Sequence, residues 1–62
     1  MKTEQEIAQK AQEIWGKMNK SQRMGAKFGM FPAELMGTPI IEEQGFSKDE
    51  RHKIVVALMK MK

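Results

Sequence analysis

The stretch TEQEIAQKAQEIWGKM, residues 3–18, decides the fold because its apolar side chains recur at the spacing of one helix face. Thr3 and Glu6 have the spacing of a capping box, in which each side chain accepts a hydrogen bond from the other residue's main-chain N–H. The apolar residues that follow recur mostly at intervals of three and four, which places them on one stripe of an α-helix: Ile7, Ala8, Ala11, Ile14, Trp15 and Met18. We therefore predict a helix over residues 3–18 that ends near Asn19.

A second amphipathic stretch, SKDERHKIVVALMKM at residues 47–61, predicts the other long helix. Ser47 and Glu50 repeat the capping-box spacing, and Asp49 and Glu50 suit the positive end of a helix dipole. The β-branched run also fits a strand, but the capping pattern favours a helix over 48–61. Its apolar arc is wider than one face, which indicates a second surface to bury.

Glycine and proline cut the segment between these helices into short pieces. Ser21 is expected to cap the first piece, and Pro32 suits the first position of the second. A Thr-Pro pair at residues 38–39 repeats that signal for a third. We therefore predict a single all-α domain over residues 1–62. It has two longer amphipathic helices, about 3–18 and 48–61, packed around short helical turns at about 22–28, 32–36 and 39–44.

The stretch SQRMGAKFGMFPAELMG, residues 21–37, has three interpretations. Main-chain N–H groups near Gly25 and Gly29 would hold an anion, with charge from Arg23 and Lys27. The two glycines would alternatively let two backbones approach closely, as small residues do on helix faces. In the third interpretation, which we favour, they end helices in left-handed geometry.

The methionines and phenylalanines are assigned chiefly to the core. Seven methionines in 62 residues is a high content, and flexible thioether side chains fill irregular gaps. An adaptable partner surface is one alternative for them, and a copper(I) site is another. Phe31 and Phe46 each precede a helix start, where an apolar side chain commonly packs on the core. Exposed aromatic side chains would instead stack on nucleic-acid bases.

Several kinds of functional site are not expected. The chain has no cysteine for a disulfide or a thiolate zinc site, and its single His52 lies among charges near a helix start. Glu42 and Glu43 are neighbours that point about 100° apart on a helix, so they do not converge. We therefore expect no enzyme, no cofactor and no metal. The longest aliphatic run is too short to cross a bilayer and no signal peptide is visible, so we expect a cytoplasmic protein without a membrane partner.

The expected function is binding to a protein partner. A chain of 62 residues buries only about 60% of its unfolded surface, so self-association would add the core that it lacks. We expect a small interaction or regulatory module that acts as a homodimer or as a subunit of a larger complex. Four residues are expected at the partner interface: Val55, Val56, Met59 and Gly16.

The alternative function is binding to nucleic acid, because the net charge is +3. Cations must share a face to neutralise successive phosphates, and the sequence leaves open which of them do. The expected anion or nucleic-acid contacts are Lys17, Lys20, Arg23, Lys27, Arg51, Lys53 and Lys60.

Overall fold

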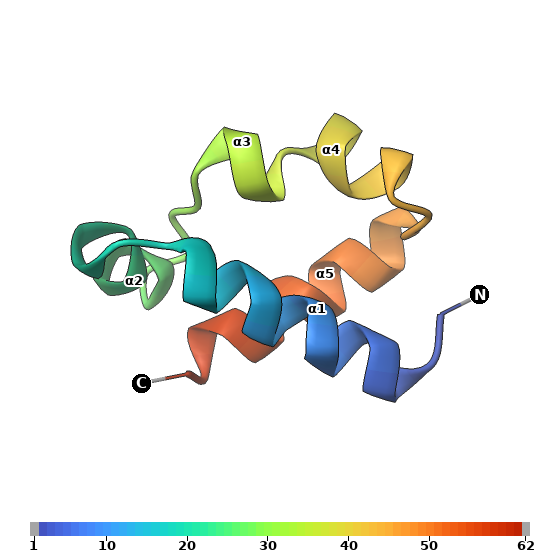
Figure 1. Cartoon of the computed structure of the whole chain (residues 1–62), viewed down its shortest axis with the longest axis horizontal. Coiled ribbons are helices and arrows are strands. Elements are labelled where there is room, and N and C mark those ends of the chain that lie inside the picture. The colour runs from blue at the N-terminus through green and yellow to red at the C-terminus, as the bar shows by residue number, and fades with distance from the viewer. Residues whose placement is uncertain (1, 62) are drawn as a thin grey trace.

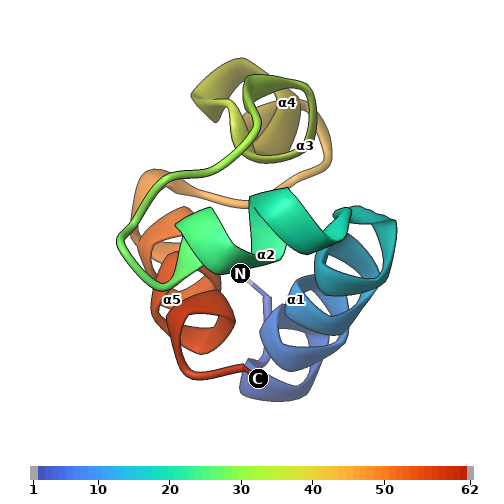
Figure 2. The ribbon, with the colours of Figure 1, turned by 90° about the vertical axis from the view of Figure 1, so that its left-hand side faces the viewer.

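A computed structural model describes residues 2–61, which form five helices and no strand. In chain order the helices are α1 (Glu4–Lys17), α2 (Lys20–Ala26), α3 (Ala33–Met36), α4 (Thr38–Glu43) and α5 (Lys48–Met59). The two long helices, α1 and α5, cross each other and form the main packing interface (Figure 1). The short helices α3 and α4 form a second layer on one side of this pair. Helix α2 lies across one end, between α1 and α5 (Figure 2).

The predicted all-α architecture is confirmed, including the short helices at about the predicted places. Both long helices begin with the predicted capping boxes, at Thr3 and at Ser47. The expected cap of α2 at Ser21 is wrong. Asn19 Oδ1 accepts from the Gln22 nitrogen over 2.8 Å, and Gln22 Oε1 accepts from the Asn19 nitrogen over 2.9 Å. Asn19 therefore starts α2 with a third capping box, directly after α1 ends.

The core is a continuous cluster that draws on both layers. Its buried residues are Ile7, Ala11, Ile14, Met18, Ala26, Met36, Ile41, Phe46, Ile54 and Leu58. The apolar stripe of α1 is narrower than predicted, because Ala8 is exposed. At about 100° per residue Ala8 lies at the edge of the stripe that Ile7 and Ile14 define. Burial of apolar area in this cluster is the main force that holds the helices together.

Glycines close two of the short helices in left-handed geometry. Gly29 has φ +78° and Gly45 has φ +93°, in the region that favours glycine. Met30 donates its main-chain N–H to the Gly25 oxygen over 3.0 Å, and Gly29 donates to the Ala26 oxygen over 3.0 Å. These two bonds form a Schellman motif, which satisfies carbonyl groups at the end of α2. The favoured interpretation of residues 21–37 is therefore correct for Gly29 and wrong for Gly25, which lies inside α2 and has no positive φ.

A single glycine joins α3 to α4 and leaves no room for a side chain. A Cβ atom built on Gly37 would lie 2.5 Å from the Ala33 carbonyl oxygen, which real Cβ atoms essentially never do. Gly37 donates its own N–H to that oxygen over 2.8 Å. Next to this joint, Arg51 Nε on α5 donates to the Met36 oxygen over 2.8 Å. The α3–α4 layer is thus held to α5 by a hydrogen bond as well as by apolar packing.

Candidate functional site

Large apolar side chains are most exposed on α2 and in the turn that follows it. The exposed fraction is 78% for Phe28, 69% for Met30 and 58% for Met24. The assignment of methionine to the core is therefore correct for Met18 and Met36 but wrong for Met24 and Met30. Among the phenylalanines, the assignment to the core is correct for Phe46, which is buried, and for Phe31, which is partly buried, but wrong for Phe28. Exposed Met and aromatic side chains are typical of surfaces that bind a partner.

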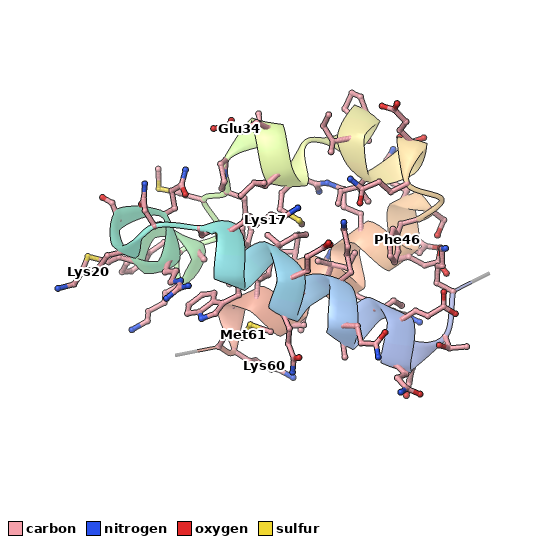
Figure 3. The ribbon with its side chains drawn as sticks, viewed as in Figure 1. Lys17, Lys20, Glu34, Phe46, Lys60 and Met61 are labelled. Atoms are coloured by element: carbon pink, nitrogen blue, oxygen red, sulfur yellow. The ribbon has the colours of Figure 1, made fainter. Side chains whose placement is uncertain are left out.

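Three cations lie close to these apolar residues: Lys20 and Arg23 are on α2, and Lys27 is its C-cap residue. Lys20, Arg23 and Lys27 line one open depression of about 460 Å³ together with Trp15 and Met24. Residues 18–33 contain these three cations and no acidic residue. Lys20 projects from the outer end of α2, away from the rest of the molecule (Figure 3). Three positive charges therefore lie close together around α2.

The cations and the apolar residues occupy neighbouring stripes of α2. At about 100° per residue, Arg23, Lys27 and Lys20 follow one another around the helix within a sector of about 60°. Met24 comes next on the same side of the axis, and Phe28 follows in the turn after α2. Ala26 lies roughly opposite them and is fully buried in the core. We call the two stripes together with Trp15 the α2 surface: Trp15, Lys20, Arg23, Met24, Lys27 and Phe28.

Arg23 is held in place by two contacts with the end of α1. Its Nε donates to the Trp15 carbonyl oxygen over 2.9 Å, and its guanidinium carbon lies 5.2 Å from the centre of the Trp15 ring. This position combines a hydrogen bond with a cation–π interaction. The bond uses only Nε, and the two terminal nitrogens carry four further donors. Arg23 therefore offers a fixed positive charge with donors for an anionic partner.

The other cations expected to bind an anion lie elsewhere. Lys17 Nζ lies 3.9 Å from Glu13 Oε1 on α1. Arg51 donates a hydrogen bond to the Met36 oxygen in the α3–α4 layer. It lies on the opposite side of α5 from Lys53 and Lys60. Lys53 and Lys60 line a second depression, of about 510 Å³, which also contains the acidic residue Glu4. Of the seven expected cations, the structure gathers Lys20, Arg23 and Lys27 in one depression that no acidic residue lines.

The residues expected at a protein interface are only partly brought together. Val56 is 37% exposed and Met59 is 42% exposed, whereas Val55 packs against the chain's own core. These three residues follow one another within a sector of about 100° on α5. Gly16 is exposed on α1, and a Cβ atom built there would meet nothing within 4 Å. It lies opposite the stripe of α1 that packs on α5, so it does not extend the same patch.

Three carboxylates have a lowered pKa, and each is explained by a local structural contact. The main-chain N–H of Thr3 lowers the pKa of Glu6, and the side chain of Lys10, 2.6 Å away, lowers that of Glu13. A hydrogen bond from the main-chain N–H of Ser47 is the chief cause of the lowered pKa of Glu50. These groups belong to helix caps and to a surface ion pair of α1. None of the three is part of the α2 surface.

Some kinds of site are not found in the described part of the chain. Within residues 2–61, no group of three His, Cys, Asp or Glu side chains is placed to hold a metal ion. No helix in the same range has the length and apolarity needed to cross a membrane. Comparison of the chain with protein-family models, with curated proteins and with solved structures finds no match. Function is therefore inferred from the chain's own surface.

Proposed function

We propose that this chain is a cytoplasmic binding module, not an enzyme, that attaches to nucleic acid through the α2 surface. The observation that carries the proposal is the depression that Lys20, Arg23 and Lys27 share with exposed Met24, with exposed Phe28 directly after Lys27 in the chain. Lysine and arginine side chains bind phosphates and release the counterions condensed around them, which drives association. No acidic residue lines this depression, so no carboxylate there opposes the contact with a phosphate.

Self-association through α5 is the second candidate function, favoured by the exposed side chains of Val56 and Met59. A stable interface buries about 800 Å² on each partner, which is roughly a fifth of the 4412 Å² of accessible surface here. Val55, Val56 and Met59 alone do not supply such an area, since each is already more than half covered. Charge attraction, in contrast, acts over a small contact area. We therefore rank nucleic-acid binding first.

The test is binding of a fluorescein-labelled oligonucleotide, followed by fluorescence anisotropy from about 50 to 200 mM salt. With three phosphate contacts, the slope of log K against log salt concentration is about −2 on a single strand. The double variant Lys20→Gln/Lys27→Gln keeps one contact, so its slope falls to about −0.7. Lys53→Gln/Lys60→Gln is the matched control, because it removes the same charge from α5 and should retain the wild-type slope.

Two results would count against the proposal. No anisotropy change for the wild type with DNA or RNA at about 50 mM salt would end it. Greater loss of binding in the α5 double variant than in the α2 double variant would move the contact to α5. Light scattering on the same samples tests the second candidate, because a dimer that Met59→Glu dissociates would support self-association through α5.

A further inference from the structure

We infer that the α2 surface takes a single nucleic-acid strand, with phosphates along Lys20, Arg23 and Lys27 and bases against Met24 and Phe28. This inference rests on the proposed nucleic-acid function and names the kind of nucleic acid. An unpaired strand exposes its charged backbone along one edge and its unstacked bases along the other. The two stripes of α2 have the same arrangement, with the cations beside the apolar pair.

Phe28 supplies the contact that paired bases cannot make. Its ring is 78% exposed and is placed four residues after Met24, which is 58% exposed. A base stacks on an aromatic ring only when its own face is free, and in a duplex both faces are covered by neighbouring base pairs. An exposed ring next to cations is therefore useful for a single strand and of little use for a duplex.

The one-sided charge of α2 also favours a single strand over a duplex. A helix that enters the major groove lies in a channel about 12 Å wide with phosphates on both sides. The edge of α2 beyond Phe28 is uncharged, since it carries Ser21, Gly25 and Gln22. Cations on one edge match one phosphate backbone and leave the second without a partner.

Arg23 is ordered before any ligand arrives, which lowers the cost of binding. Its Nε bond to the Trp15 oxygen and its position over the Trp15 ring restrict the side chain. A free arginine loses rotamer entropy when it is immobilised on a ligand, and a side chain that is already restricted loses less. The same geometry places the chain's single tryptophan in the depression, so its fluorescence reports on occupancy.

The test compares three probes of about 12 nucleotides: oligothymidylate, an abasic strand of the same length, and a duplex. The abasic strand keeps every phosphate and lacks every base. We expect the wild type to bind oligothymidylate about 5- to 150-fold more tightly than the abasic strand, the range for one stacked base. Phe28→Ala should abolish this preference and Phe28→Leu should retain part of it. Met59→Ala, which truncates an exposed apolar residue of α5, is the control and should keep it.

The binding results distinguish failure of this inference from failure of the proposed function. Equal affinity for oligothymidylate and the abasic strand, or a duplex bound as tightly as the single strand, overturns the inference and leaves the proposed function standing. Failure to bind any probe at about 50 mM salt overturns both. Binding to vesicles of phosphatidylserine and phosphatidylcholine, with no binding to any oligonucleotide, also overturns both and assigns the surface to membranes. Unchanged circular dichroism of Phe28→Ala shows that a lost preference is not a lost fold, as expected for an exposed side chain.

Discussion

The main-chain nitrogen of Lys2 donates a hydrogen bond to Oε2 of Glu50, 48 residues further along the chain, over 2.5 Å. The other carboxylate oxygen of Glu50 accepts from the Ser47 nitrogen over 2.8 Å, which closes the cap of α5. Glu50 is only 6% exposed. The N–H of Ser47 and then that of Lys2 stabilise the charged form, so the pKa of Glu50 lies below its ordinary value of 4.5.

The first prediction concerns acid stability. Because the pKa of Glu50 is lowered in the folded state, its ionised form stabilises the fold above its ordinary pKa, and this contribution is lost as pH falls through the lowered pKa. Glu50→Gln should lower the melting temperature at neutral pH and flatten its decline between about pH 5 and pH 3. Thermal melts by circular dichroism measure both. Glu43→Gln, at an exposed position of α4, is the control, and parallel profiles for Glu50→Gln and wild type would contradict the prediction.

The second prediction concerns the joint between α3 and α4. Gly37→Ala should destabilise the domain by about 1–3 kcal/mol, because the new methyl group would lie 2.5 Å from the Ala33 oxygen and the backbone would have to move. Urea denaturation measures the change. Gly25→Ala is the control, since its Cβ would lie at an ordinary 3.5 Å from atoms of Met30. Equal stability of Gly37→Ala and wild type would show that the joint relaxes freely.

The third prediction concerns Gly16, in the exposed face of α1. Gly16→Ala should stabilise the domain by about 0.5–1 kcal/mol, because alanine has the higher helix propensity and its methyl group would meet nothing within 4 Å. The same variant tests the expected interface. If Gly16 is a point of close approach between two copies, alanine there would weaken the dimer. Unfolding in urea together with light scattering distinguishes these results.

The fourth prediction concerns Arg51, which was one of the expected nucleic-acid contacts. Arg51→Met should cost about 1–2 kcal/mol, because it leaves the Met36 carbonyl without the donor that lies 2.8 Å away. Lys53→Met removes the same charge from an exposed position of α5 and should cost less than about 0.5 kcal/mol. Equal unfolding midpoints for the two variants would show that the bond to Met36 adds nothing to stability.

Local sequence signals account for the helices but not for the exposed surface. The capping boxes at Thr3 and Ser47 depend on residues three apart, so they are visible in the sequence. The box at Asn19 was missed although Asn and Gln are spaced in the same way. The exposure of Met24 and Phe28 depends on which side of a short helix meets α1 and α5. A helix of seven residues is too short for its apolar periodicity to determine the buried side. Tertiary packing determines it, and in α2 the buried residue is Ala26.

The residues of the candidate site could likewise be predicted from the sequence only in part. Lys20, Arg23 and Lys27 were among the seven expected cations, because their charge is visible in the sequence. Their separation from Arg51 and Lys53 was not predictable, since it depends on where α2 and α5 lie in the fold. The contact between Arg23 and Trp15 joins the end of α1 to α2 across a change of chain direction. Only the structure reveals it.

The crossing of α1 and α5 also determines how cooperatively this chain unfolds. Its main interface joins the first helix to the last, so segment 18–47 must form a closed loop before the two helices meet. Isolated helices shorter than about 12–15 residues are marginal in water, and α2, α3 and α4 are all shorter than that. We expect none of them to persist without α1 and α5. Protected amide protons in α3 and α5 should therefore exchange through one shared global opening, with equal free energies.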